Sequence, residues 1–113
     1  MKRNALLGAF LGGLAMVALL GASPTPPMST PITVHIKDFA FHPPTLTITA
    51  GQTVRFINDD QDAHTVTGVG FDSEGLDTGD SWTHTFDKPG TYMYYCELHP
   101  YMKGTIVVRA AGK

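Results

Sequence analysis

The sequence predicts an all-β domain built as a two-sheet sandwich. Short runs in which apolar and polar residues alternate follow one another from residue 32 to residue 108, which is the period of a half-buried strand. Thr, Val, Ile and Tyr dominate these runs, and such residues suit a pleated surface. Turn signals rich in Gly, Pro and Asp separate them. About seven short strands with regular turns in about 80 residues are typical of a β-sandwich or barrel.

Each expected strand carries its own set of alternating side chains. Residues i and i+2 of a strand share one face, so we expect each set to point into the core. No helical period competes with this pattern after residue 32. The sets are Ile32, Val34 and Ile36; Leu46 and Ile48; Val54 and Phe56; Trp82, His84 and Phe86; Tyr92, Tyr94 and Cys96; and Ile106 and Val108.

Composition restricts the possible functions. A chain of 113 residues allows one domain, and an apolar content of 42% is sufficient for a core. The net charge of −2 provides no basic surface for nucleic acid. The single cysteine, Cys96, cannot form a disulfide within the chain. An unpaired thiol in an exported protein therefore needs another explanation.

The first 22 residues have the features of a secretory signal. Lys2 and Arg3 precede an apolar run over residues 5–20, and small residues follow it. The alternative is a membrane anchor that is not cleaved, although the run is shorter than the ~20 residues of a typical span. We expect a signal peptide or hydrophobic anchor helix over 1–22, a Pro-rich linker over 23–31 and one folded domain over 32–113. The protein is then exported, most simply to the periplasm.

A thiolate, an imidazole and a thioether occur close together near the C-terminus, as Cys96, His99 and Met102. His64 is the candidate for a fourth ligand. Two imidazoles with thiolate and thioether sulfur favour copper. Zinc is the competing metal, but a thioether adds little to a zinc site. Taken singly, Cys96 and Met102 could be core residues and His64 a surface residue; the spacing of all four favours a metal site.

The remaining histidines and acids are expected to be structural or solvated. His35 and His42 lie near turns or solvent, and His84 alternates with two aromatic residues. The loop acids are interpreted as solvent-exposed charges. They are Asp59, Asp60, Asp62, Asp72, Glu74, Asp77 and Asp80.

From Ile32 to Val108 the chain resembles the cupredoxins, and among them the amicyanins. The resemblance is carried by residues 41–51, 54–58, 89–96 and 102–108, and by the position of His64. Two residues separate Cys96 from His99 and two separate His99 from Met102, which is the short ligand loop of amicyanins. The resemblance implies a cupredoxin-like Greek-key β-sandwich. It also implies one type 1 copper ion, bound by His64, Cys96 and His99 near a plane, with Met102 as the axial ligand.

The resemblance also implies roles for residues around the ligands. The Asn58 side chain would tether the two ligand loops, and its backbone N–H would point at the Cys96 sulfur. Leu98 stands where amicyanins usually have proline, and leucine retains an N–H. We therefore expect the Leu98 N–H to donate to the same sulfur. Pro100 flanks the second histidine.

The function implied by the resemblance is that of a periplasmic blue-copper electron carrier, not an enzyme. His99, ringed by Leu98, Pro100 and Tyr101, would be the point of electron exit. The resemblance implies redox partner proteins, namely an amine dehydrogenase and a c-type cytochrome. No nucleic-acid partner is expected. Contact with a membrane is expected only if the N-terminal helix is not cleaved. The alternative is a copper-binding module for periplasmic copper delivery or storage.

Overall fold

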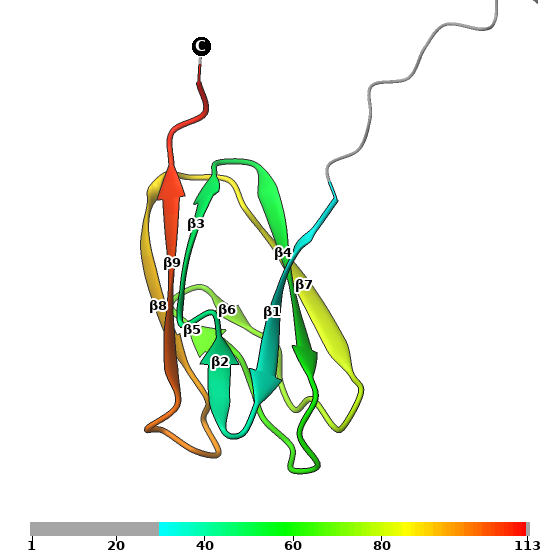
Figure 1. The fold of residues 1–113 in the computed structure, drawn as a ribbon. Coiled ribbons are helices and arrows are strands. Elements are labelled where there is room, and N and C mark those ends of the chain that lie inside the picture. The colour runs from blue at the N-terminus through cyan, green and yellow to red at the C-terminus, as the bar shows by residue number, and fades with distance from the viewer. Residues whose placement is uncertain (1–29, 113) are drawn as a thin grey trace, which may run out of the picture.

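The computed structural model describes residues 30–112 and arranges them as two packed β-sheets. The first sheet has the strand order β2-β1-β4-β7 and the second the order β3-β9-β8-β5-β6 (Figure 1). The strands are β1 (Ile32–Lys37), β2 (Ala40–His42), β3 (Thr45–Thr49), β4 (Gln52–Asn58), β5 (Thr67–Gly68), β6 (Phe71–Asp72), β7 (Ser81–Phe86), β8 (Gly90–Tyr95) and β9 (Lys103–Arg109).

Strand pairing in each sheet is mixed. β1 runs parallel to β4, and β3 runs parallel to β9. The other pairs within the sheets are antiparallel, including the long β4–β7 and β8–β9 pairs. The chain crosses between the sheets at every connection except β1–β2, β5–β6 and β8–β9. Parallel strands cannot be joined by a hairpin and need a longer connection. Here that connection crosses to the other sheet, and the crossings bring segments that are distant in the sequence together.

The core confirms the alternation predicted from the sequence. Val34 and Ile36 in β1, and Val54 and Phe56 in β4, are completely buried. Their neighbours in the chain are more exposed. The expected sets of β3, β8 and β9 also turn inward, and Trp82 and His84 of β7 are half-buried. Each sheet thus contributes one apolar face, as sandwich packing requires.

The all-β sandwich is confirmed, with one difference in detail. Residues 30–112 contain nine strands, more than expected. The strands outside the expected sets are β2, which pairs with β1, and residues 67–72, which pair as a two-residue hairpin, β5–β6, around the Val69-Gly70 turn. The predicted N-terminal helix and most of the linker lie outside the described residues. Within those residues, no helix is long and apolar enough to cross a membrane.

One end of the sandwich collects the segments that carry the predicted ligands. The β8–β9 loop, the chain leaving β4 and the β1–β2 turn all lie at the lower end in Figure 1. His64 follows β4, and the loop from Cys96 to Met102 joins β8 to β9. The fold therefore places both ligand-bearing loops at the same end of the sandwich.

Behind this end, Tyr94 packs against Gly104, its direct partner in the β8–β9 ladder. Tyr94 is buried between Phe41 and Phe56, with ring centroids 4.7 Å and 5.4 Å away. Its hydroxyl has no hydrogen-bond partner within the described residues, and burial raises the pKa of Tyr94 well above its usual range. A Cβ at residue 104 would overlap Cζ and Oη of this ring.

We therefore expect Gly104→Ala to destabilise the protein. The tyrosine is enclosed and cannot move aside, and overpacking of this kind costs about 1–3 kcal/mol. Gly75→Ala is the matched control, since its Cβ would meet no atom within 4 Å. Urea unfolding of the metal-free proteins measures the difference. Equal midpoints for the two variants would contradict the packing described here.

Candidate metal centre

Three predicted ligands come together at the lower end of the sandwich. His64 Nδ1 and His99 Nδ1 each lie 3.7 Å from the Cys96 sulfur. The ligand atoms of the three residues all lie within 4.8 Å of one another. His64 and Cys96 are completely buried, whereas His99 is partly exposed. The structure thus forms a compact N,N,S cluster from residues that are up to 35 positions apart in the chain.

The spacing of this cluster fits a shared metal ion. A metal–nitrogen bond is about 2.0 Å long and a metal–sulfur bond about 2.3 Å. If the nitrogen–metal–sulfur angle is about 120°, the nitrogen and the sulfur lie about 3.7 Å apart. The observed distances of 3.7 Å match this value for both histidines. A trigonal set of two imidazoles and one thiolate is the donor set of blue-copper centres.

Strand pairing explains why His64 and Cys96 meet. Thr67 of β5 is the ladder partner of Tyr95 in β8, and Cys96 directly follows Tyr95. His64 lies three residues before Thr67 and is held by two backbone hydrogen bonds with Leu76, of 2.7 Å and 3.1 Å. The register of the second sheet therefore fixes the distance between two ligands from different loops.

The loop carrying the other ligands is closed by its own backbone. Met102 N–H donates to His99 O over 2.8 Å, and Cys96 N–H donates to Met102 O over 3.1 Å. His99 N–H donates to Cys96 O over 3.2 Å. Met102 is almost completely buried. These bonds form a tight turn that holds Cys96, His99 and Met102 together.

Thr65 connects the two ligand loops, a role that was predicted for Asn58. Its backbone N–H donates to the Cys96 sulfur over 3.3 Å, and its hydroxyl accepts the Glu97 N–H over 2.8 Å. The prediction that the Asn58 N–H donates to this sulfur is wrong, and no hydrogen bond from the Leu98 N–H to the sulfur is found among the described residues. The Asn58 N–H donates to Asp80 O instead. Among the described residues, Thr65 is the one backbone donor to Cys96 Sγ.

Asn58 organises the histidine loop but does not bridge to the cysteine loop. It is completely buried. Its side-chain amide donates to the carbonyls of Asp62 and Leu76, each over 2.8 Å, and its side-chain oxygen accepts the Asp60 N–H over 2.8 Å. The expected tether therefore acts within residues 58–76, on the backbone that presents His64.

Asp60 is buried, and its interpretation as a solvated loop acid is wrong. Its carboxylate lies 2.9 Å from His64 Nε2 and accepts the backbone N–H groups of Asp38 and Phe39 over 2.7 Å and 2.9 Å. Burial acts to raise the pKa of Asp60, but these donors outweigh it and hold the pKa below its ordinary value. A carboxylate on the far nitrogen fixes the His64 tautomer and leaves Nδ1 free for a metal.

The β1–β2 turn covers the cluster with an aromatic ring. The Phe39 ring stands edge-on to both imidazoles, with centroids 5.2 Å from His64 and 4.9 Å from His99. Asp38 and Phe39 both have positive φ, 53° and 56°, which is costly for a bulky residue. The two hydrogen bonds to Asp60 offset this cost. Phe39 could not be predicted from the sequence, since the turn lacks the usual Asn-Gly or Asp-Gly pair.

The remaining histidines of the described chain lie outside the cluster, as expected. His84 stacks on Trp82 with ring centroids 5.4 Å apart, and burial lowers its pKa. His35 and His42 lie on the exposed face of the β1–β2 hairpin. Leu98, Pro100 and Tyr101 are exposed beside His99.

Comparison with known proteins identifies the family. Residues 10–108 match the family model described as a cupredoxin-like domain. The chain belongs to the cupredoxin family. Within that family it is similar to amicyanins. It is 37% identical to amicyanin-alpha of Methylorubrum extorquens, over 92% of this chain and 93% of the relative. It is 28% identical to amicyanin of Paracoccus denitrificans, over 94% of each chain.

Solved structures agree with this assignment. A reduced variant of amicyanin superposes with a TM-score of 0.69 at 30% identity, over 74% of this chain and 87% of that one. The Cu(I) form of another amicyanin variant gives the same score, identity and coverage. The predicted family and the cupredoxin-like sandwich are thereby confirmed.

Thr65→Val is expected to loosen the connection between the ligand loops. The substitution keeps the backbone donor to Cys96 but leaves the Glu97 N–H without its acceptor, at a cost of about 1–3 kcal/mol. Thr53→Val is the control, because its hydroxyl pairs with that of Thr85 at an exposed site. Chemical denaturation of the metal-free proteins and the rate of metal loss to a chelator measure the effect. If both variants lose metal at the wild-type rate, Thr65 does not connect the loops.

Asp60→Asn is expected to lower the free energy of unfolding in a pH-dependent way. The amide cannot accept all three hydrogen bonds with the strength of a carboxylate. Because the pKa of Asp60 is held below its ordinary value of 3.8, its ionised form contributes stability above that value, and the contribution is lost as the pH falls through the folded pKa. The difference in the free energy of unfolding between wild type and variant should be largest at neutral pH and should shrink below about pH 4. Asp77→Asn, in an exposed loop, is the control. A difference independent of pH would refute this account.

Proposed function

We propose that this protein is a type 1 blue-copper electron carrier. The observation that carries the proposal is the buried Cys96 sulfur, 3.7 Å from the Nδ1 atoms of two histidines. Copper as the cofactor, predicted from the sequence, is confirmed by this donor set together with the family. His64, Cys96, His99 and Met102 are the residues that would hold the ion.

The chain's own residues hold the site in one arrangement. The ion supplies one-electron redox chemistry when bound. Strand pairing fixes His64 relative to Cys96, the Asp60 carboxylate orients the His64 ring, and Thr65 N–H stabilises the thiolate. Hydrogen bonds around the ligands tune such a centre. A site built on two packed sheets changes little between oxidation states, which suits a relay.

The exposed surroundings of His99 support electron exchange with partner proteins. His99 is the partly exposed member of the cluster, and Leu98 and Tyr101 beside it are 55% and 69% exposed. Together with Pro100 they present an apolar rim next to a ligand. A small apolar contact of this kind suits weak, transient redox encounters. We propose that this rim is the docking surface and that no substrate turnover takes place there.

The relatives support a proposal for the location and the partners. We propose that residues 1–22 direct export, that 23–31 form a linker and that 32–113 act in the periplasm. We propose, from the resemblance to amicyanins, that its redox partners are an amine dehydrogenase and a c-type cytochrome. A copper delivery or storage module is the alternative. The complete burial of Cys96 and His64 favours the carrier, because a delivery site must release its ion readily.

The carrier proposal is tested by adding Cu²⁺ to the metal-free protein and recording its colour and voltammogram. We expect an intense blue colour, a reversible one-electron wave and slow loss of copper to a chelator. Cys96→Ser should bind copper without the blue colour, because the thiolate–copper interaction produces it. Met102→Leu should alter the potential, while Met93→Leu, at a residue 67% exposed, should not. A colourless complex, or copper lost within the time of mixing, would favour delivery.

A further inference from the structure

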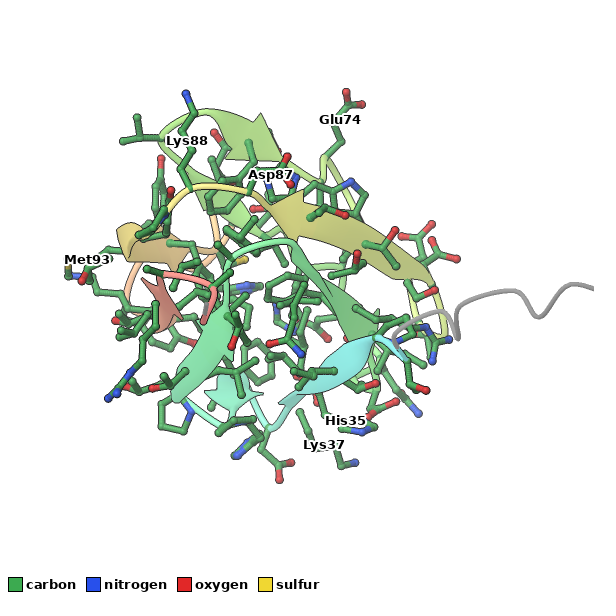
Figure 2. All side chains as sticks on the ribbon, turned by 90° about the horizontal axis from the view of Figure 1, so that it is seen from above. His35, Lys37, Glu74, Asp87, Lys88 and Met93 are labelled. Carbon is green, nitrogen blue, oxygen red and sulfur yellow. The ribbon has the colours of Figure 1, made fainter. Side chains whose placement is uncertain are left out.

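The β1–β2 hairpin carries two histidines on its outer face, away from the copper cluster. His35 and His42 are direct partners in the antiparallel β1–β2 ladder. Both are exposed, while their neighbours Ile36 and Phe41 are buried. Directly opposed residues have Cβ atoms about 4.5–5.5 Å apart. Two imidazoles at this spacing can reach one ion between them. Figure 2 shows the His35 side chain at the rim of the molecule, outside the packed interior.

A hydrogen bond orients each of these rings and leaves one nitrogen free. His35 Nδ1 lies 2.6 Å from Asp59 Oδ2, and His42 Nε2 lies 3.0 Å from Lys37 O. A carbonyl can only accept, so His42 carries its proton on Nε2. The Asp59 carboxylate holds a proton on His35 Nδ1 in the same way. The free lone pairs are then on His35 Nε2 and His42 Nδ1. Donation of the other ring N–H to a carboxylate or a carbonyl is the arrangement found around histidine metal ligands.

The hairpin that presents the two rings is itself well fixed. Its turn residues donate two backbone hydrogen bonds to Asp60, and β1 is paired along its length with β4. Asp59 N–H also donates to Ile36 O over 2.8 Å, which places the orienting carboxylate beside β1. Lys37 is the nearby cation on the same face, and its exposed, flexible chain can keep the ammonium in solvent.

We propose that His35 and His42 form a second metal site, which binds one divalent transition-metal ion at the protein surface. Imidazole nitrogen selects borderline ions such as Cu²⁺, Ni²⁺ and Zn²⁺, and Cu²⁺ binds most tightly in that series. Neither sulfur atom of the copper cluster belongs to this site. The bound ion is therefore an ordinary cupric ion, completed by water, and not a blue centre. Asp59 is a positioning residue that acts through His35.

The test is a titration of the blue, singly copper-loaded protein with further Cu²⁺, followed by calorimetry and electron paramagnetic resonance. We expect one additional equivalent, with a tetragonal copper signal that shows coupling to two nitrogens. His35→Ala and His42→Ala should each weaken this binding at least tenfold, and the double variant should abolish it. Both side chains are exposed, so these variants should fold.

Two further variants separate ligand and positioning roles. Asp59→Asn should weaken binding about tenfold through loss of the orienting carboxylate. Lys37→Gln changes the same face without removing a ligand and should keep the additional equivalent with its two-nitrogen signal. The proposal is overturned if the His35→Ala/His42→Ala double variant binds the additional ion as tightly as the wild type, or if the wild type binds none. The blue centre is read separately from its colour, so failure of either proposal is recognised independently.

Discussion

The buried sulfur of Cys96 is the constraint on which the rest of the site depends. A thiolate without water costs free energy unless charges and donors surround it. Here the surroundings are two imidazole nitrogens at 3.7 Å and the Thr65 N–H at 3.3 Å. A metal ion held by the sulfur and the imidazoles would supply positive charge beside the sulfur. The β-sandwich keeps these groups together because each is attached to a strand end or to a closed loop.

Three sets of contacts connect the ligands to the rest of the fold. The Thr65 hydroxyl links the histidine loop to the cysteine loop. The Asp60 carboxylate links His64 to the β1–β2 turn. The β1–β2 turn also places the Phe39 ring against both imidazoles. The centre is therefore surrounded on several sides by groups that have their own partners, and movement of one ligand would break hydrogen bonds in another element. Such cross-connection is how a protein preorganises a metal site.

Much of this organisation was predictable from residue types and spacing, and some was not. Val34 and Ile36, like Ile106 and Val108, alternate with more exposed neighbours. This alternation predicts which residues are buried, because one face of each sheet is apolar. The sequence also pointed to His64, Cys96, His99 and Met102 because their chemistry is unusual in combination. Asp60 could not be separated from its exposed neighbour Asp59, since both are acids in one loop and only the tertiary structure decides which carboxylate turns inward. The donor to Cys96 was misassigned for a similar reason. A backbone N–H leaves no mark in the sequence, so Thr65 could be found only from the geometry.

The centre depends on ligands that the surrounding hydrogen bonds hold in place. The most direct measurement is a pair of high-resolution crystal structures, one metal-free and one loaded with copper. We predict that the His64 and His99 rings keep their positions, with sulfur–nitrogen distances close to 3.7 Å in both structures. Rings that swing away from Cys96 in the metal-free protein, or a copper ion bound without the Cys96 sulfur, would contradict the account.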